Sequence, residues 1–246
     1  MRSPESCESC PHAEQGMFAV LPSPDLHQVG VRKRTSLYKR GQVVFHEGNI
    51  PFGLFCVFSG AVKVAKAGPA GREQIVRLAR PGDVLGYRAL FADEPYTGTA
   101  VALEDSLLCL IPRETVLPLL TRCPALALAV IRRLTHDLRI AEEWVRDMAL
   151  MNARQRLAET LLMLQVTYGI RDQEGTRLSL LLSRQELAEM AGLATETAIR
   201  LLGEFRAKGI LSVRGREVTI REPRALLRLS GLRGLARLAE EDRVRT

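Results

Sequence analysis

Residues 183–206, SRQELAEMAGLATETAIRLLGEFR, constrain this chain more than any other stretch, because they predict two short helices joined by a tight turn. Ser183 is suited to cap the first helix, and Glu186 completes the pattern of a capping box. Gly192 supplies the left-handed backbone that a sharp turn needs. Ala188 is small enough to let two helices cross closely, so the spacing predicts a helix-turn-helix. An ordinary pair of packed helices is the alternative.

The second helix is expected over about residues 195–205, with one face buried and one exposed. In the two helices and the turn between them, the expected buried positions are Leu187, Ala191, Leu193, Ala198, Leu201 and Leu202. If a DNA major groove is present, the exposed side chains face it. Including the start of the first helix, the candidate contact residues are Ser183, Arg184, Thr195, Glu196, Thr197, Ile199 and Arg200.

Residues 210–220, ILSVRGREVTI, predict a β-hairpin directly after these helices. A strand pair in this place makes the motif a winged helix. Arg214 and Arg216 flank the glycine of the turn and are suited to phosphate contacts. A solvated hairpin tip has the same composition, but the neighbouring helices favour the DNA-binding interpretation.

The distribution of charge agrees with a nucleic-acid partner. The net charge is +7, and residues 151–246 hold 17 basic and 12 acidic residues, or +5 of it. A length of 246 residues predicts two domains or one large one. The chain has no apolar run long enough to cross a membrane, and its polar N-terminus lacks a signal peptide, so we expect no membrane association and a cytoplasmic location. In that compartment its five cysteines are expected to be free, metal-bound or redox-active.

Residues 37–112 show short alternating runs separated by glycines, which predict an antiparallel barrel or roll. The expected strands cover residues 42–45, 54–58, 61–65, 74–78, 99–103 and 107–111. Another helix is expected at residues 153–168, followed by a polar loop at residues 169–176. The fold class is therefore α+β.

A long helix is expected over residues 124–151, and its apolar residues repeat every three and four positions. That spacing is typical of a coiled-coil seam and predicts a homodimer. Packing of the same stripe onto the roll of its own chain is the alternative. The expected interface residues are Ile131, Leu134, Leu138, Ala141, Val145 and Met148.

This order of elements resembles the Crp–Fnr family of bacterial transcription regulators over roughly residues 30–230. The resemblance is carried by Gly41, Glu47-Gly48, Ser59-Gly60, Pro81-Gly82-Asp83, Gly86, residues 107–112 and the helix-turn-helix. It implies a homodimer that binds an inverted repeat in double-stranded DNA and acts with RNA polymerase. The expected division is an N-terminal cysteine-containing segment at 1–24, a β-roll sensor domain at 25–123, a dimerisation helix at 124–151 and a winged helix-turn-helix domain at 152–246.

The family's cyclic-nucleotide binders carry a glutamate after a turn glycine and an Arg-Ser or Arg-Thr pair further on. The arginine is the charge partner of the nucleotide phosphate. Here Tyr87 takes the place of the glutamate, and Thr97-Gly98 takes the place of the pair. Arg88 is a cation at a different position. The sequence therefore argues against cAMP.

The Fnr branch of the family binds an iron–sulfur cluster with N-terminal cysteines and one cysteine before an Ile-Pro step. Cys7, Cys10 and Cys109 match those places, and a third N-terminal cysteine is absent. The resemblance thus implies three of the four ligands of a [4Fe–4S] cluster. His12, Glu14 or an exogenous ligand remains open as the fourth. Cys56 is expected in the core and Cys123 before the dimer helix, while a vestigial Cys-x-x-Cys and a Cys109 that only packs are alternatives.

In the family the recognition helix presents a glutamate and, four residues later, an arginine, which here are Glu196 and Arg200. Arginine binds guanine O6 and N7, and glutamate accepts from cytosine N4. Glu196 is also expected to orient Arg200. The alternative is that these two residues form only an intrahelical salt bridge with each other. Ile199 replaces the serine of the Fnr branch and is suited to a thymine methyl group.

Three function classes follow from these observations. A DNA-binding regulator that responds to oxygen, redox state or nitric oxide comes first, and no enzymatic activity is expected. The same regulator controlled by a small organic effector, or constitutive, is the second. A cupin-like metalloenzyme is a remote third, because its metal ligands would have to cluster and the four histidines are scattered: His12, His27, His46 and His136.

Overall fold

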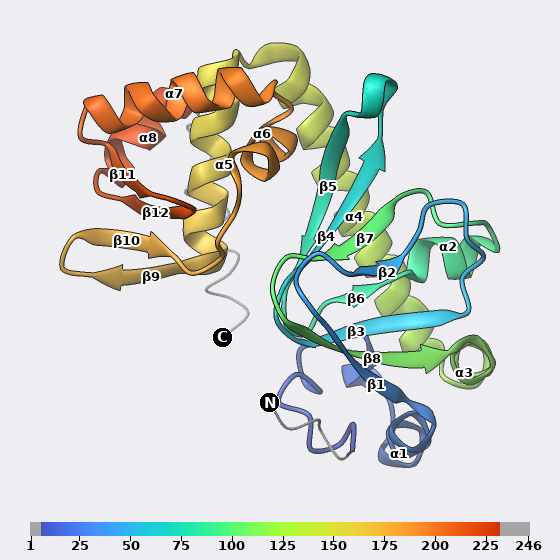
Figure 1. Cartoon of the computed structure of the whole chain (residues 1–246). Helices are drawn as coiled ribbons and strands as arrows, with labels where there is room; N and C mark the ends of the chain where they lie inside the picture. Colours follow the sequence, from blue (N-terminus) through green and yellow to red (C-terminus); the bar gives the residue numbers. More distant parts are fainter. Residues whose placement is uncertain (1–5, 232–246) are drawn as a thin grey trace. The chain divides into compact units, whose positions relative to one another are not determined.

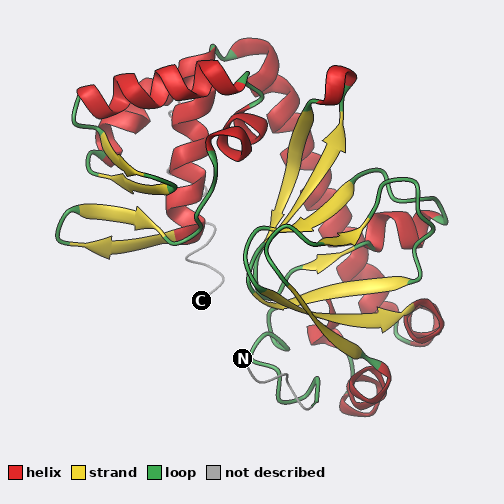
Figure 2. Ribbon diagram, in the orientation of Figure 1, coloured by secondary structure: helices red, strands yellow, loops and turns green. Residues whose placement is uncertain are grey.

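The computed structural model describes residues 6–231, and the chain forms two compact units, Met1–Glu142 and Glu143–Thr246. The division falls inside one long helix, α4 (Pro124–Leu150). Each unit is described by itself. Figure 1 gives the labels of the elements, and Figure 2 shows that strands dominate the first unit and helices the second.

The first unit is a β-roll made of two antiparallel four-stranded sheets. One sheet has the order β1-β8-β3-β6 and the other the order β2-β7-β4-β5. All six predicted strands are present, and β1 and β6 are additional. The strands are β1 (Arg34–Tyr38), β2 (Val43–Phe45), β3 (Gly53–Ser59), β4 (Val62–Ala67), β5 (Glu73–Ala79), β6 (Val84–Leu85), β7 (Thr99–Ala102) and β8 (Ser106–Pro112).

Side chains alternate across these strands, so β3 and β8 serve two different cores. Phe55 and Leu108 pack between the two sheets. Leu54 and Ile111 face the other side, against the helices. Gly60 permits the turn between β3 and β4, because its φ is +88° and a Cβ there would lie 2.3 Å from the Ser106 hydroxyl oxygen.

Helices cover the outer face of the β3–β8 sheet. They bury a second apolar cluster that includes Val29, Val116 and Leu126. The α1 and α3 helices lie beside each other in Figure 1. The sequence pattern did not predict three of these helices, α1, α2 and α3. The helical elements before α4 are η1 (Met17–Val20), α1 (Ser23–Arg32), η2 (Pro69–Gly71), α2 (Tyr87–Ala92) and α3 (Arg113–Arg122).

The described part of the second unit combines the end of α4 and the helices α5 to α8 with a four-stranded sheet in the order β11-β12-β10-β9. The predicted helix at residues 153–168 is α5, and Asn152 caps it through a capping box with Gln155. The helices after α4 are α5 (Ala153–Tyr168), α6 (Arg184–Ala191), α7 (Thr195–Ala207) and α8 (Pro223–Ser230). The strands are β9 (Gly169–Asp172), β10 (Gly175–Leu178), β11 (Leu211–Arg214) and β12 (Glu217–Ile220).

The expected polar loop at residues 169–176 is wrong, because this stretch belongs to the β9–β10 hairpin. Alternate residues of β10, Thr176 and Leu178, are buried, and Thr176 pairs with Ile220 of β12. All four residues of β9 are exposed, which made the stretch resemble a loop. The hairpin exists because β12 supplies a neighbouring strand.

No single helix within residues 6–231 is long and apolar enough to cross a bilayer. The α3 and α4 helices reach the required length and composition only when they are joined across a bend of 107°.

Candidate functional site

The helix-turn-helix consists of α6 and α7, and its turn has the predicted local structure. The Ser183 hydroxyl accepts from the Glu186 amide at 3.1 Å, and the Glu186 carboxylate accepts from the Ser183 amide at 2.5 Å. Gly192 ends α6 with a φ of +62°. Arg156 of α5 also holds this turn, because its guanidinium donates to the carbonyls of Ala191 and Gly192. The sequence analysis did not single out Arg156.

One face of α7 is exposed and carries the residues that were expected to read DNA. Glu196, Ile199 and Arg200 are exposed, while Thr195 and Thr197 are half-buried. Ile199 exposes 51% of its surface and lies between Glu196 and Arg200 in the sequence. A partner surface with an apolar group is a physical reason to keep it there.

The expectation that Glu196 orients Arg200 is wrong in this structure. Arg200 instead donates to the Glu204 carboxylate at 2.5 Å, one turn further along α7. Arg154 of α5 donates to the other oxygen of Glu204 at 2.7 Å. The hydrogen bond from Arg154 is the main reason that the pKa of Glu204 lies below its ordinary value. Glu196 is exposed.

The hairpin of β11 and β12 forms a wing with a glycine at its tip. Gly215 has a φ of +58°, and Arg214 and Arg216 beside it are exposed. Arg184, which was expected to contact DNA, donates to the Gly215 carbonyl at 2.6 Å. Arg184 thus connects the start of α6 to the wing tip.

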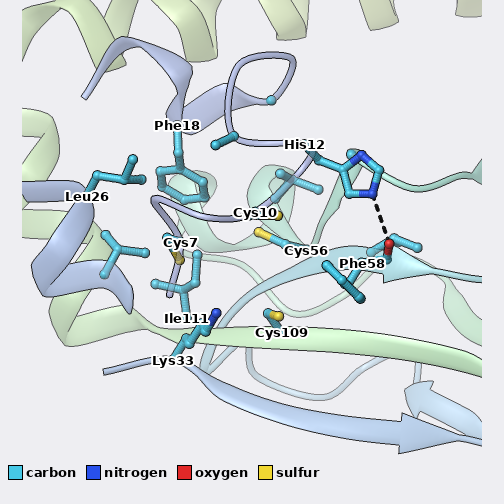
Figure 3. Close-up of a pocket in the computed structure, with 16 residues that line it drawn as sticks. Cys7, Cys10, His12, Phe18, Leu26, Lys33, Cys56, Phe58, Cys109 and Ile111 are labelled. Carbon is cyan, nitrogen blue, oxygen red and sulfur yellow. Dashed lines mark hydrogen bonds between the residues drawn. The ribbon is translucent and has the colours of Figure 1, made fainter. Parts of the chain in front are cut away.

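Four cysteines line one pocket in the first unit: Cys7, Cys10, Cys56 and Cys109. Figure 3 shows their side chains around a space between the N-terminal segment and strands β3 and β8. Cys56 packs against the helix-covered core, as expected, and its half-buried side chain also lines the pocket. Cys123 is buried at the end of α3, away from this pocket.

The strand register explains why Cys56 joins the others. Cys56 of β3 pairs directly with Cys109 of β8, so both side chains project from the same face of the sheet. Thr35 of β1 pairs with Cys109 on its other side, and the Thr35 hydroxyl lies 3.5 Å from the Cys109 sulfur. Sequence reasoning missed Cys56 because the pairing register of two strands is not visible in their spacing.

The N-terminal segment is held against the roll by short-range contacts. The Cys10 amide donates to the Cys7 carbonyl at 3.3 Å, which closes a turn around the Cys-x-x-Cys. His12 Nε2 lies 3.0 Å from the Phe58 carbonyl oxygen. Gly30 of α1 allows close approach, because a Cβ there would lie 3.1 Å from the Cys7 nitrogen.

The pocket is mostly apolar, with one cation at its wall. Burial is the main cause that raises the pKa of Cys7, and it raises the pKa of Cys56 well above the ordinary value. The ammonium of Lys33, which lines the pocket, acts in the opposite direction on both thiols. Lys33 therefore offsets part of the effect of burial on Cys7 and Cys56, whose thiolate forms are the forms that bind metals.

The donor set of the pocket fits an iron–sulfur cluster better than a single metal ion. Within residues 6–231, no three His, Cys, Asp or Glu side chains converge closely enough to hold one ion. A zinc ion needs four ligands within about 2.3 Å of one point. A cluster takes its thiolates around its periphery, and four thiols are its usual complement. The cavity volume of about 60 Å³ is far below the roughly 300 Å³ at which organic ligand sites begin.

The region equivalent to a cyclic-nucleotide site contains a polar network around Tyr87, and Arg88 is exposed. Tyr87 is buried, accepts a hydrogen bond from Arg77 at 2.6 Å and donates to the Asp137 carboxylate on α4. Arg133 of α4 pairs with Asp137 at 3.1 Å and with Asp83 at 3.4 Å. Arg88 lies 3.3 Å from the Thr97 hydroxyl. The two arginines of the network, Arg77 and Arg133, therefore already interact with residues of the same network.

The expected dimer seam on α4 is largely exposed in the single chain. Ile131, Leu138 and Val145 expose 56%, 60% and 63% of their surfaces. Ala141 is also exposed and Met148 is half-buried, whereas Leu134 packs against the helix-covered core of the first unit. An apolar row of this kind is typical of an interaction surface.

Comparison with known proteins decides the family. Residues 36–123 match the family description "Cyclic nucleotide-binding domain", and residues 155–229 match "Crp-like helix-turn-helix domain". An anaerobic regulatory protein of Pasteurella multocida is 30% identical over 226 residues, which cover 92% of this chain and 82% of the relative. This chain belongs to the Crp/Fnr family. Its members are DNA-binding transcription regulators rather than enzymes, so the cupin-like alternative is dropped.

Two further similarities, one in sequence and one in structure, agree with this family assignment. The fumarate and nitrate reduction regulatory protein of Escherichia coli is 28% identical over 226 residues, with 92% of this chain and 90% of the relative covered. The structure of FixK2 from Bradyrhizobium japonicum has a TM-score of 0.69 at 24% identity, covers 80% of this chain and 96% of that one, and supports the fold alone. The predicted fold, with an antiparallel roll, a long helix and a C-terminal helix-turn-helix, is confirmed.

Proposed function

We propose that this Crp/Fnr regulator binds an inverted repeat in double-stranded DNA as a homodimer and reads each half-site with α7. The observation that carries the proposal is the exposed row Glu196, Ile199 and Arg200 on the second helix of a capped helix-turn-helix. A carboxylate, an aliphatic group and a guanidinium supply the three kinds of contact that base edges accept in the major groove. Arg214 and Arg216 would add phosphate contacts.

The homodimer is supported by the exposed apolar seam of α4. An inverted repeat requires a two-fold symmetric protein, with recognition helices about 34 Å apart. A seam that repeats every seven residues places matching side chains opposite each other in two parallel copies. Ile131, Leu138 and Val145 have this spacing and are exposed.

The proposed sensor is an iron–sulfur cluster held by Cys7, Cys10 and Cys109. An iron–sulfur cluster supplies a redox-active centre that reacts with oxidants. The support in this chain is the apolar pocket with several thiols and the Lys33 cation. Relatives named for anaerobic regulation are consistent with such a signal.

Control by cAMP is not part of the proposal. A cyclic phosphate requires a cation that it can pair with. Arg77 and Arg133 already pair with Asp83 and Asp137, and the buried Tyr87 hydroxyl lies among these groups. A cytoplasmic location and contact with RNA polymerase belong to the same proposal and follow from the family.

The test is selection of DNA from a random duplex library, with protein purified and handled without oxygen. The expected product is a palindrome whose half-site centres lie one helical turn apart, and two chains should bind each duplex. Selection of single half-sites by one chain, or of no sequence at all, would contradict the proposal.

A further inference from the structure

Cys56 lies within β3, directly opposite Cys109 of β8, and both side chains line the same pocket. Its neighbour Phe55 faces the other side, into the core between the two sheets. Strand alternation therefore assigns Cys56 to the pocket and not to that core. Figure 3 shows Cys56 between Cys10 of the N-terminal segment and Cys109.

His12, the other candidate donor near the pocket, is engaged elsewhere. Its Nε2 lies 3.0 Å from the Phe58 carbonyl oxygen, and its ring packs edge-on against the Phe58 ring with centroids 5.9 Å apart. These contacts give His12 a structural role in holding the N-terminal segment to β3. Cys56 is then the remaining sulfur donor in the pocket wall.

We propose that Cys56 is the fourth thiolate ligand of the iron–sulfur cluster, together with Cys7, Cys10 and Cys109. This inference rests on the cluster of the proposed function and adds its ligand set. Four thiolates complete the coordination of a cluster. Each thiol releases its proton to solvent when its sulfur bonds to iron. Two of the ligands thus come from the N-terminal segment and two from paired strands of the roll.

The experiment uses the full-length protein, purified without oxygen and reconstituted with ferrous iron and sulfide. The wild type should hold about four iron atoms and four sulfides per chain and show the brown charge-transfer absorption of a cluster. Cys56→Ser and Cys56→Ala should each lose iron, sulfide and colour to the same extent as Cys109→Ser. The matched control Cys123→Ser should keep the cluster content of the wild type. Cys123 is a suitable control because it is buried outside the pocket.

A second measurement does not depend on the colour of the protein. Alkylation of the native protein followed by mass spectrometry should find Cys56 protected in the reconstituted form and modified after a chelator and an oxidant remove the iron. Circular dichroism and thermal unfolding of each variant, measured without iron, identify any variant that has failed to fold. Because two substitutions are tested at Cys56, loss of folding in one leaves the other to decide the result.

Several results would overturn the inference, and they are distinguishable. A wild type that takes up no iron and sulfide would remove both this inference and the cluster of the proposed function. Full cluster content in both Cys56 variants would remove only this inference. A stable Cys56–Cys109 disulfide or one tightly held zinc ion per chain would also exclude the four-thiolate cluster.

Discussion

At the scale of residues, the two arginines at the DNA-binding surface have different surroundings. Arg200 is exposed and pairs only with a neighbour on its own helix, Glu204. An exposed pair of this kind contributes no more than about 1 kcal/mol, so Arg200 can exchange Glu204 for a base at little cost. Arg184 is tied to the Gly215 carbonyl and is half-buried. Arg200 is therefore the better candidate for base recognition.

We predict that Arg200→Ala weakens binding to the selected palindrome by about 1–3 kcal/mol and relaxes the preference at one base pair. Glu204→Gln is the matched control, because it removes the intrahelical pair and keeps the arginine. Arg214→Ala should instead weaken all sequences equally and reduce the salt slope by about one. Titrations of a palindrome and its single-base variants at several salt concentrations measure these effects. Equal loss on every sequence would contradict base reading by Arg200.

A second prediction at this scale concerns Glu159 of α5, whose pKa is raised to about 7. Burial is the main cause, and the nearby Asp147 carboxylate adds to it. The folded state thus holds a proton that the unfolded state releases near pH 4.5. Since the folded state binds more protons in this window, stability should fall as the pH rises from about 4.5 to 7.

Glu159→Gln should remove this loss, because the amide stays neutral. Relative to the wild type, the variant should gain roughly 1–3 kcal/mol of unfolding free energy at pH 8 and little at pH 5. Thermal unfolding at both pH values measures the difference, with Glu196→Gln as a control at an exposed carboxyl of the same unit. A gain that does not depend on pH would contradict the assignment.

At the scale of elements, α4 has two faces with different uses. Leu126 and Val130 are buried against the roll, and Leu134 packs there as well. Ile131, Leu138 and Val145 lie on the exposed side. Packing onto the core of its own chain thus accounts for one face of the helix, and the exposed face is the proposed dimer seam.

We predict that Leu138→Asp yields a monomer, because two buried carboxylates would face each other across the two-fold axis. Ile140→Asp is a matched control, since Ile140 is also exposed on α4 but lies off the seam. Sedimentation velocity at micromolar concentration measures both variants. If both remain dimers, or both become monomers, the seam assignment is wrong.

At the scale of the whole molecule, the proposed sensor and the proposed dimer seam have separate determinants. The cysteine pocket lies among the N-terminal segment, β3 and β8, while the exposed seam lies along α4. The seam positions hold no charge that would oppose association in the absence of a signal. Apolar burial at about 25 cal/mol per Å² drives such an association without help.

Dimerisation is therefore predicted to be independent of the cluster. Metal-free protein should sediment as a dimer at micromolar concentration, and Cys109→Ser should do the same. The signal would then act on the DNA-binding unit, for which the segment around Asn152 is our proposed hinge. A metal-free monomer that dimerises only after reconstitution would contradict this prediction.

The sequence alone determined the elements whose causes are local. The capping box of Ser183 and Glu186, the left-handed Gly192 and the wing glycine depend on residues a few positions apart, so their spacing predicts their geometry. The sequence predicted only part of the cysteine pocket. Cys7, Cys10 and Cys109 match the cysteine positions of the Fnr branch, whereas Cys56 matches none of them.

Only the tertiary structure decided features that join distant segments. Cys56 meets Cys109 because β3 pairs with β8 in one register. A register shift of one residue would turn the Cys56 side chain into the core between the two sheets. Residues 169–178 form a hairpin because β12 lies beside β10. Glu204 of α7 is held by Arg154 of α5, a residue 50 positions away in the sequence. In each case the deciding neighbour lies on another element, where no local pattern records it.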